Sequence, residues 1–484
     1  MGIIKLANEA LGNLQNVEVP TYNLKHKECR ILHIGVGNFH RAHQAFYLHE
    51  LLQLEDTPWR ICGAGLMQQD IHMKKSLEEQ DHLYTLVSQK SDSEKIRIIG
   101  TIRDYVHIGS EYQKFIELFA SDELKILSLT ITEKGYCLNT DWNLDIEHKG
   151  IVHDLENPND IPHTAIGILA YGLEQRMLRG AKPLTIMSCD NIPQNGEVLK
   201  GIITQFVAQA KKTELKEYLE KSVKFPSSMV DRITPVTTKD KKDYLASKYG
   251  IQDQVPVFSE DFIQWVIEDD FNVERPEWER LGVQLVKDVK PYEHMKTRLL
   301  NGGHTALTFP SLLAGHIFVD DAMNDSRISA FLRAFMNEVK TTLKPIEGVD
   351  YAAYIDELLT RFANPAIKDR LQRLAEDTSV KFLNFIIPPL IALLKEGRDV
   401  SMITFALASW IVYLFKSTSN PEYAINDPIG EKLQEAATKS IADCTEFLSI
   451  AEIFPKEIMN YKEFHHGLTK NIKEIQEKGI EGAL

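Results

Sequence analysis

The sequence predicts a two-domain α/β protein, with a doubly wound N-terminal domain and a mostly α-helical C-terminal domain. Its 484 residues exceed what one hydrophobic core usually organises. In the first half, short apolar β-type runs alternate with helical patterns, and beyond about residue 286 these runs nearly vanish. We therefore place a domain boundary there and expect domains at residues 1–286 and 287–484.

The N-terminal strands are expected at five apolar runs, residues 30–34, 60–66, 95–99, 124–131 and 184–188. Strands that alternate with helices form a parallel sheet covered on both faces, and ligands bind beyond the carboxyl ends of its strands. Two of the runs end in polar loops, and the loop residues Thr132, Glu133 and Asn191 are therefore candidates for binding a ligand. An Asx turn at a strand exit explains Asn191 equally well.

The C-terminal domain shows helical periodicity, clearest at residues 328–343, 351–362 and 431–450. Its most apolar segments, residues 382–394 and 402–415, are shorter than the roughly 20 residues that cross a bilayer. We expect both to be buried helices and expect no membrane partner.

A glycine-rich turn follows the first apolar run, in the order strand, tight turn, helix. Gly35 would allow the turn, Gly37 would let a pyrophosphate approach, and the free N–H groups at the helix start would bind its charge. His40 takes the place of the third glycine of the dinucleotide motif, and Arg41 is expected to contact a phosphate. This favours a Rossmann-like domain, although an ordinary turn also contains Gly-x-Gly. The expected cofactor-binding residues here are Gly35, Val36, Gly37, Asn38, Phe39, His40 and Arg41.

A carboxylate that binds the ribose of a dinucleotide is expected at the end of the second strand. Glu55 and Asp56 have the usual spacing but precede that strand, whereas Asp70 follows it. Asp70 is therefore the candidate and favours NAD over NADP. Lys74 and Lys75 nearby leave room for the extra phosphate of NADP.

Lys296, Asn301 and His304 lie close together in the chain and suggest a metal-free site that moves a proton on or off a hydroxyl. In an α-helix, Asn301 would lie roughly 140° and His304 roughly 80° from Lys296 around the axis, an arc that can wrap a small polyol. As a base, Lys296 would need its pKa lowered from about 10.4 toward roughly 7 to 8 by burial near a positive charge. The alternative is a surface lysine and a core histidine beside a glycine pair that lets helices approach closely.

Composition narrows the class of protein. A formal net charge of −14 argues against nucleic acid as a partner. The five cysteines form no Cys-x-x-Cys pair, so we expect reduced thiols, a cytoplasmic location and no structural zinc.

Several long motifs, in order along nearly the whole chain, resemble the long-chain, zinc-independent polyol dehydrogenases, the mannitol dehydrogenase family. They comprise residues 35–44, 128–136, 185–196, 230–235, 264–269 and 296–304. The resemblance implies NAD as cofactor, no metal, Lys296 as general base, Asn191 and Asn301 polarising the reacting oxygen, and His304 orienting the substrate. It also implies a proton relay through Glu293 and polyol contacts from Asp231, Arg373 and Lys381, although ordinary surface charge explains Arg373 and Lys381 as well.

The implied reaction is reversible oxidation of a polyol to a ketose, D-mannitol to D-fructose above all, by a monomer or small homo-oligomer. One alternative is a uronate reductase acting on fructuronate or tagaturonate, with Arg373 and Lys381 binding the substrate carboxylate. Another is a nucleotide-binding protein that has lost turnover.

Overall fold

The computed structural model describes residues 3–484, and the chain divides into two compact units, Met1–Lys290 and Pro291–Leu484. The boundary expected from the sequence, after residue 286, lies just before this division. Each unit has its own hydrophobic core.

A six-stranded parallel sheet forms the centre of the first unit, with the strand order β6-β3-β2-β7-β8-β9. This is the doubly wound order of dinucleotide-binding domains, in which the first strand, β2, lies beside the fourth, β7. The six strands are β2 (Ile31–Ile34), β3 (Ile61–Gly65), β6 (Ile102–His107), β7 (Ile126–Leu129), β8 (Leu184–Ser188) and β9 (Val223–Lys224).

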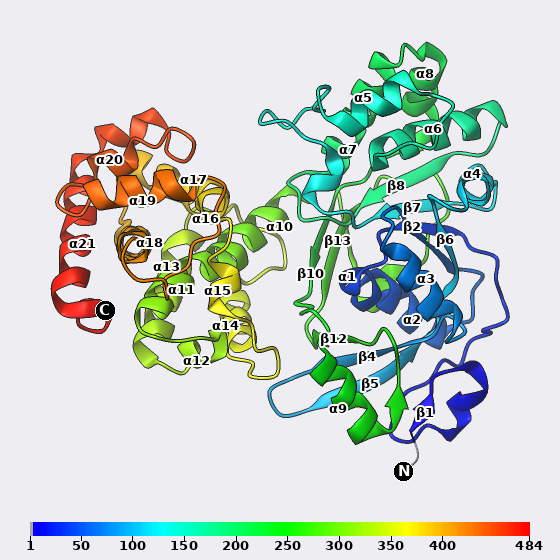
Figure 1. The fold of residues 1–484 in the computed structure, drawn as a ribbon, viewed down its shortest axis with the longest axis horizontal. Helices are drawn as coiled ribbons and strands as arrows, with labels where there is room; N and C mark the ends of the chain where they lie inside the picture. The colour runs from blue at the N-terminus through cyan, green and yellow to red at the C-terminus, as the bar shows by residue number, and fades with distance from the viewer. Residues whose placement is uncertain (1–2) are drawn as a thin grey trace. The chain divides into compact units, whose positions relative to one another are not determined.

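Helices cover both faces of this sheet (Figure 1). Alternate strand residues point to opposite faces, so Leu32 and Ile34 pack with the helices of one core while Ile31 packs with those of the other. The first core contains α4 (Tyr112–Phe119), α6 (Ala165–Leu178), α7 (Asn195–Gln209) and α8 (Thr213–Ser222). The second contains α1 (Asn38–Ala42), α2 (Gln44–Leu54) and α3 (Asp70–Glu78).

Three small sheets and several short elements complete the first unit. The sheets pair β12-β4-β5, β10-β13-β14 and β1-β11. Their strands are β1 (Ile4–Lys5), β4 (Tyr84–Gln89), β5 (Glu94–Ile99), β10 (Ser228–Asp231), β11 (Ile251–Gln252), β12 (Val257–Glu260), β13 (Gln264–Glu268) and β14 (Gln284–Val286). The remaining helices are η1 (Asn8–Asn13), η2 (Glu133–Tyr136), α5 (Lys149–Glu156), α9 (Lys239–Tyr249) and η3 (Trp278–Leu281).

The apolar run at residues 95–99 is a strand, but its predicted place in the parallel sheet is wrong. It is part of β5, which pairs antiparallel with β4 through a short turn at residues 90–93. Strand β6 begins only three residues after β5 ends, and it is β6 that joins the parallel sheet, at the edge beside β3. The sequence pattern did not separate the two strands because they are nearly contiguous.

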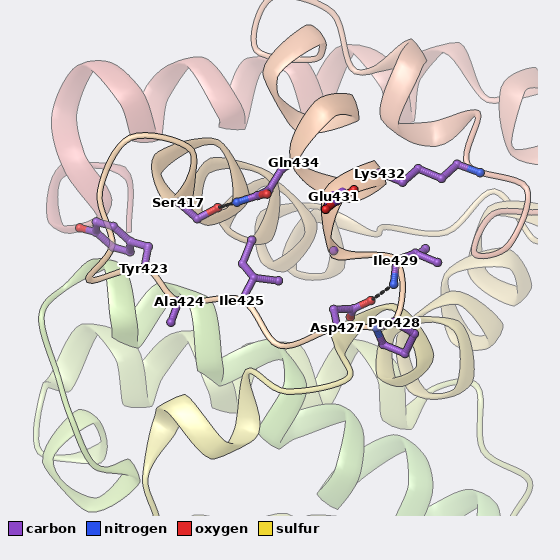
Figure 2. Close-up of a pocket in the computed structure, with 11 residues that line it drawn as sticks. Ser417, Tyr423, Ala424, Ile425, Asp427, Pro428, Ile429, Glu431, Lys432 and Gln434 are labelled. Carbon is purple, nitrogen blue, oxygen red and sulfur yellow. Dashed lines mark hydrogen bonds between the residues drawn. The ribbon is translucent and has the colours of Figure 1, made fainter.

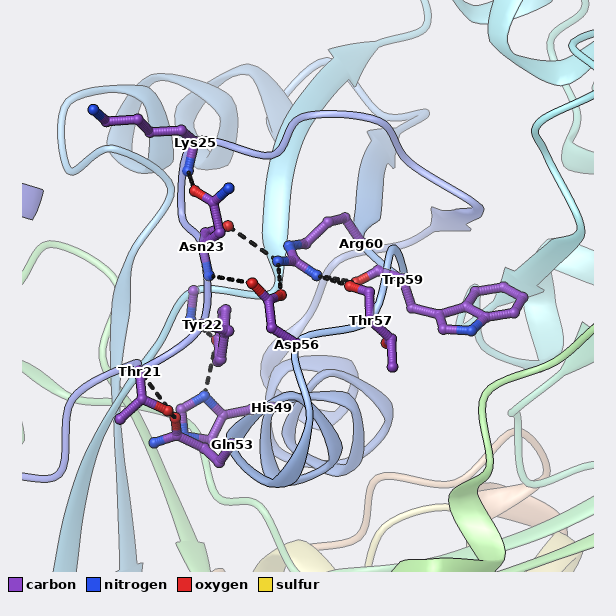
Figure 3. Close-up of polar contacts among 11 residues, drawn as sticks. Thr21, Tyr22, Asn23, Lys25, His49, Gln53, Asp56, Thr57, Trp59 and Arg60 are labelled. Carbon is purple, nitrogen blue, oxygen red and sulfur yellow. Dashed lines mark hydrogen bonds and ion pairs between the residues drawn. The ribbon is translucent and has the colours of Figure 1, made fainter.

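The segment before β2 is fixed to α2 and β3 by buried and partly buried polar contacts (Figure 3). Arg60 donates to Asp56 at 2.7 Å and to the carbonyl of Asn23 at 3.0 Å. The Tyr22 hydroxyl lies 2.9 Å from Nδ1 of His49. These contacts hold the segment around Tyr22 and Asn23 beside the end of α2 and the start of β3.

The second unit is helical, and no named strand occurs among residues 291–484, all of which the structure describes. The predicted helix at residues 351–362 is present, and the one expected at 431–450 is two helices. The helices are α10 (Lys290–Met295), η4 (Lys296–Asn301), α11 (Gly302–Leu313), α12 (Val319–Met323), α13 (Ser326–Lys340), α14 (Tyr351–Phe362), α15 (Leu371–Leu374), α16 (Thr378–Lys381), η5 (Phe382–Ile386), α17 (Ile387–Lys395), α18 (Ser401–Ser417), α19 (Gly430–Lys439), α20 (Thr445–Leu448), η6 (Lys456–Asn460) and α21 (Lys462–Ala483).

The apolar segment expected at residues 382–394 belongs to a longer helical run, Thr378–Lys395, which is long and apolar enough to cross a membrane by length and composition alone. Its residues Phe382, Ile386, Leu390 and Leu393 are buried in the core of the unit. Packing against α11 and α18 accounts for this apolar face.

Candidate functional site

The predicted dinucleotide turn lies at the carboxyl end of β2, where the sheet order places a ligand. Gly35 has φ +95, and a Cβ there would lie 2.1 Å from the carbonyl oxygen of Thr130 on the chain after β7. Only glycine fits this position. Gly37 precedes the first turn of α1 and is exposed, and a Cβ there would meet only the Gly35 oxygen at 3.9 Å. The turn thus leaves open space beside Gly37, as the close approach of a pyrophosphate requires.

The residues after Gly37 differ in how they are placed. Asn38 and Phe39 are partly buried and Val36 is buried. His40 is buried and stacks face to face on His33, with ring centroids 3.4 Å apart. The structure thus places His40 in a buried, stacked position beneath the turn.

The expectation that Arg41 contacts a phosphate is not met. Its side chain is only 2% exposed. The guanidinium donates to the carbonyls of Gly37 and Val255 and to Oδ1 of Asn38, and it lies over the ring of Tyr84. Each of the three guanidinium nitrogens donates to an acceptor in the protein, so the buried Arg41 side chain stabilises the start of α1.

Asp70 follows β3, at the same edge of the sheet as the glycine turn. Its Oδ2 accepts from the backbone N–H of Met67 at 2.8 Å, and a Cβ on Gly65 would lie 2.4 Å from the Asp70 Cβ. Lys74 is paired with Glu111 and Glu78. Since Lys74 is neutralised in this way, the arrangement favours a ribose hydroxyl over a phosphate at Asp70, whereas Lys75 is exposed.

The loops after β7 and β8 are joined by Asp190, which the sequence reasoning missed. Its two carboxylate oxygens accept from the backbone N–H groups of Ile131 and Thr132 at 3.0 and 2.9 Å and from the hydroxyl of Tyr136 at 2.8 Å. Burial raises the pKa of Asp190, and these hydrogen bonds oppose the rise. Because Asp190 is fixed, the exposed side chain of the next residue, Asn191, is held at the strand end. In the sequence, this role of Asp190 is indicated by its place as the acidic residue directly before Asn191.

Thr132 has φ +62 and is exposed with Glu133, so both are displayed at this edge. Asp231 is the last residue of β10 and is buried. Its neighbour Arg232 donates to the carbonyls of Glu260 and Ala42 and to the hydroxyl of Ser88, which fixes the end of β10.

In the second unit, Lys296 and Asn301 are the first and last residues of a π-helical segment, η4, inside one continuous helix that runs from α10 through α11. The α-helical arc expected from the sequence is therefore wrong. A π-helix has about 4.4 residues per turn, or roughly 80° per residue, which places Asn301 about 50° from Lys296. Three further α-helical residues bring His304 to within about 10° of Lys296. The three side chains share one face of the helix.

Burial and packing further define this face. Lys296 is buried, with 7% of its surface exposed, while Asn301 and His304 are partly buried. The His304 ring stacks on Phe362 of α14, with centroids 3.9 Å apart. The neighbouring glycines do allow close packing, because a Cβ on Gly303 would lie 2.6 Å from the methyl of Met336. Glu293 is partly buried in α10.

Arg373 and Lys381 lie in the short helices α15 and α16 of the second unit. The Arg373 guanidinium forms a two-pronged pair with Asp369, with contacts of 2.8 and 2.6 Å. Lys381 donates to the carbonyl of Leu374 at 3.0 Å, and burial together with Arg373 lowers its pKa. Lys381 also directly precedes a second π-helical segment, η5, whose Phe385 carbonyl lies against Gly302, where a Cβ would be 3.4 Å away.

An open hollow of about 610 Å³ lies in the second unit, at the loop between α18 and α19 (Figure 2). None of the predicted site residues lines it. The loop that forms it carries Asp427, whose carboxylate accepts from the N–H and hydroxyl of Ser379 at 2.7 Å each. The hollow thus belongs to a loop that supports the start of the helical run containing Lys381.

One group of possible metal ligands occurs among residues 3–484, formed by His153, Asp154 and His163 of the first unit. The two rings stack in parallel, 3.5 Å apart, so their nitrogens do not converge on one ion. Asp154 accepts from the backbone N–H groups of His163 and Thr164 and from the Thr164 hydroxyl. This geometry fits a fixed loop before α6 better than a metal site.

Comparison with known proteins agrees with this architecture. The mannitol dehydrogenase Rossmann domain model matches residues 29–280, and the mannitol dehydrogenase C-terminal domain model matches residues 288–476. Mannitol 2-dehydrogenase of Aspergillus fumigatus is 39% identical over 474 residues, which cover 96% of this chain and 94% of that protein.

Two solved structures match over the whole chain. The ternary complex of Pseudomonas fluorescens mannitol 2-dehydrogenase with NAD and D-mannitol is 38% identical, with a TM-score of 0.86 over 99% of this chain and 98% of that one. A substrate-free D-sorbitol dehydrogenase is 34% identical, with a TM-score of 0.90 over 99% of both chains. The chain therefore belongs to the mannitol dehydrogenase family, whose members are oxidoreductases that act on CH–OH groups.

Proposed function

We propose that this protein is an NAD-dependent polyol dehydrogenase that oxidises D-mannitol to D-fructose reversibly, without a metal ion. The observation that carries the proposal is the match, at 38% identity over 99% of the chain, to an enzyme whose structure holds NAD and D-mannitol. The match to a D-sorbitol dehydrogenase at similar identity makes a related polyol the nearest competitor.

The first unit has the features that NAD requires. Open space beside Gly37, the N–H groups at the start of α1 and the Asp70 carboxylate at the end of β3 fit the pyrophosphate and a ribose. NAD, when bound, supplies the acceptor for the hydride that leaves the alcohol carbon. The exposed Thr132 and Glu133 stand at the same edge of the sheet and complete the proposed cofactor site.

Lys296 is the proposed general base. A secondary alcohol releases hydride readily only as its hydroxyl proton leaves, so the reaction needs a neutral amine. Lys296 is buried, and we propose that its surroundings in the working enzyme favour the neutral amine. In the reverse direction the same group returns the proton to the carbonyl oxygen. Glu293, three residues earlier in the same helix, is the proposed route of that proton to solvent.

Asn301 and Asn191 are proposed to donate side-chain N–H groups to the reacting oxygen, which carries growing negative charge as the proton leaves. His304, on the same helical face as Lys296, would orient the substrate, and its stacking on Phe362 fixes the ring plane. Asp231, buried at the end of β10, is a proposed contact for the polyol hydroxyls.

The uronate reductase alternative needs free cations for a substrate carboxylate. Arg373 is already paired with Asp369 through two hydrogen bonds, and Lys381 donates to a carbonyl. These pairings favour a neutral polyol, with Arg373 and Lys381 acting near its far end.

The test is a comparison of kcat/KM for mannitol, sorbitol, arabinitol, fructose and fructuronate with both nicotinamide cofactors. We expect mannitol and fructose with NAD to exceed the other pairs by about tenfold or more, since one misplaced hydroxyl leaves buried polar groups unpaired. Preference for fructuronate would contradict the proposal. Prolonged EDTA treatment should leave activity intact, and loss of activity that zinc restores would refute the metal-free mechanism.

A further inference from the structure

A chain of buried and partly buried hydrogen bonds runs beneath the glycine turn of the first unit. His33 of β2 lies opposite Ser128 of β7 in the parallel register. Its Nδ1 is 2.7 Å from Ser128 Oγ, and its Nε2 is 2.9 Å from Thr130 Oγ1. Thr130 Oγ1 in turn donates to the carbonyl oxygen of Gly35 at 2.6 Å. The chain thus connects the two central strands to the turn itself.

The direction of the protons in this chain follows from counting donors. Burial lowers the pKa of His33 to about 3, so its ring is neutral and carries one N–H. The only proton of the Thr130 hydroxyl goes to Gly35, so Nε2 of His33 carries the N–H and donates it to Thr130, with the Gly35 carbonyl as a second acceptor at 3.3 Å. Nδ1 is then an acceptor and takes the Ser128 proton.

The Gln44 amide completes the chain at its other end. Ser128 Oγ lies 2.8 Å from Gln44 Oε1, while Gln44 Nε2 is buried without a hydrogen-bond partner. Because the Ser128 hydroxyl donates its proton to His33, its oxygen can only accept a hydrogen bond from Gln44. A half-turn of the amide supplies one and leaves the shape of the side chain unchanged. All donors then point one way, from Gln44 through Ser128, His33 and Thr130 to Gly35.

The Gly35 carbonyl is where these contacts converge. It also accepts from the backbone N–H of Gly37 at 2.7 Å, and the stack of His40 on His33 keeps the imidazole in its plane. Fixing this carbonyl fixes the peptide plane from Gly35 to Val36 and hence the direction of the N–H groups that follow. We propose that His33, Ser128 and Thr130 are positioning residues that hold the turn in its cofactor-binding shape before the cofactor arrives. The proposal rests on NAD binding at Gly35–Gly37.

The decisive comparison is Thr130→Val against Thr130→Ser in the full-length protein, with NADH affinity measured by fluorescence titration and apo-protein stability by thermal unfolding. Valine keeps the branched shape and removes the hydroxyl, whereas serine keeps the hydroxyl. We expect Thr130→Val to weaken NADH binding about tenfold, the scale of one lost hydrogen bond, and Thr130→Ser to stay within about twofold of the parent.

Variants at position 33 test the direction in which these hydrogen bonds are donated. A glutamine amide at position 33 reaches the Nε2 position and can donate to Thr130, whereas an asparagine amide reaches only the Nδ1 position near Ser128. His33→Gln should therefore retain more NADH affinity than His33→Asn. If a variant at position 33 does not fold, Ser128→Ala measures the same chain from its other side and should weaken NADH binding by a few-fold.

The outcomes are distinct. If Thr130→Val lowers the melting temperature but binds NADH as tightly as Thr130→Ser well below that temperature, these hydrogen bonds stabilise only the core. The proposal is then overturned. Equal NADH affinity for His33→Gln and His33→Asn would overturn the direction assigned to the protons. If the unaltered protein fails to bind NADH, the proposed function fails instead.

Discussion

The glycine turn of the first unit and the lysine segment of the second unit both depend on irregular backbone, but the irregularity has different origins. At Gly35 it is required by the residue type, because φ is +95 and the Thr130 carbonyl leaves no room for a Cβ. At Lys296 to Asn301 it is a π-helical segment made of residues that any α-helix accepts. A π-segment inside an α-helix is often found at functional sites. The first geometry can therefore be inferred from a motif, and the second depends on how the unit packs.

Removal of the proposed base should have the largest effect. Lys296→Ala should lower kcat by about 10³- to 10⁴-fold, the scale of lost general base catalysis, while NADH still binds, because the glycine turn is untouched. Steady-state kinetics with mannitol and NADH fluorescence titration measure the two effects. Lys290→Ala, an exposed lysine at the start of the same helix, is the matched control. Turnover within about tenfold of the parent for Lys296→Ala would exclude Lys296 as the base.

A change of helical register should have the next largest effect, and it removes no proposed catalytic group. Insertion of one alanine after Thr297 should turn Asn301 and His304 by about 100° around the helix axis relative to Lys296. The face shared by the three side chains would then be lost, and kcat should fall by about 10²-fold, as small displacements in a site do. Deletion of Thr297 is the matched control, because a π-segment behaves as a one-residue insertion and the deletion leaves the three residues at i, i+4 and i+7 of an α-helix, on one face as before. Circular dichroism and thermal unfolding should show a folded protein. Full activity in a folded insertion variant would mean that the shared face is not used.

The two glycines of the turn should fail in different ways. In Gly35→Ala the new Cβ meets the Thr130 backbone, so the apo protein should lose stability by about 1–3 kcal/mol or more. In Gly37→Ala the Cβ has open space, so the apo protein should stay stable while NADH affinity falls by about tenfold or more. Thermal unfolding and NADH titration separate these effects. If Gly37→Ala bound NADH normally, the space beside Gly37 would not hold the pyrophosphate.

The difference between the glycine turn and the π-segment also decides how much of the site could be predicted from the sequence. The doubly wound sheet, the Gly35 turn and the position of Asp70 followed from local patterns that depend on residue type and strand ends. The burial of Arg41 could not be predicted, because its acceptor on Val255 is more than 200 residues away. The role of Asp190 depends on β7 and β8 lying side by side. The π-segment has no sequence marker, and this is why the predicted arc of Lys296, Asn301 and His304 was wrong.

The smallest expected effect is a difference between the two units in how their stability depends on pH. In the first unit, burial lowers the pKa of His33 and His49 to about 3. The unfolded chain binds protons below about pH 6.5 that these folded rings do not, so their contribution to stability falls as the pH drops below that value. In the second unit, burial raises the pKa of Glu338 to about 7, although its carboxylate accepts from the N–H groups of Met402 and Ile403 at the start of α18.

For Glu338 the sign is opposite. The folded protein holds a proton that the unfolded chain has released, so stability is lost as the pH rises from about 4.5 to about 7. After allowance for partial exposure of the side chain we expect ~1–2 kcal/mol, or about 2–6 °C in the melting temperature of this unit. Glu338→Gln should match the parent at pH 5 and melt higher than the parent at pH 8, whereas hydrogen exchange in the first unit should not differ between them. Equal pH slopes for the parent and Glu338→Gln would show that Glu338 stays ionised in the folded protein, and that the hydrogen bonds from α18 outweigh its burial.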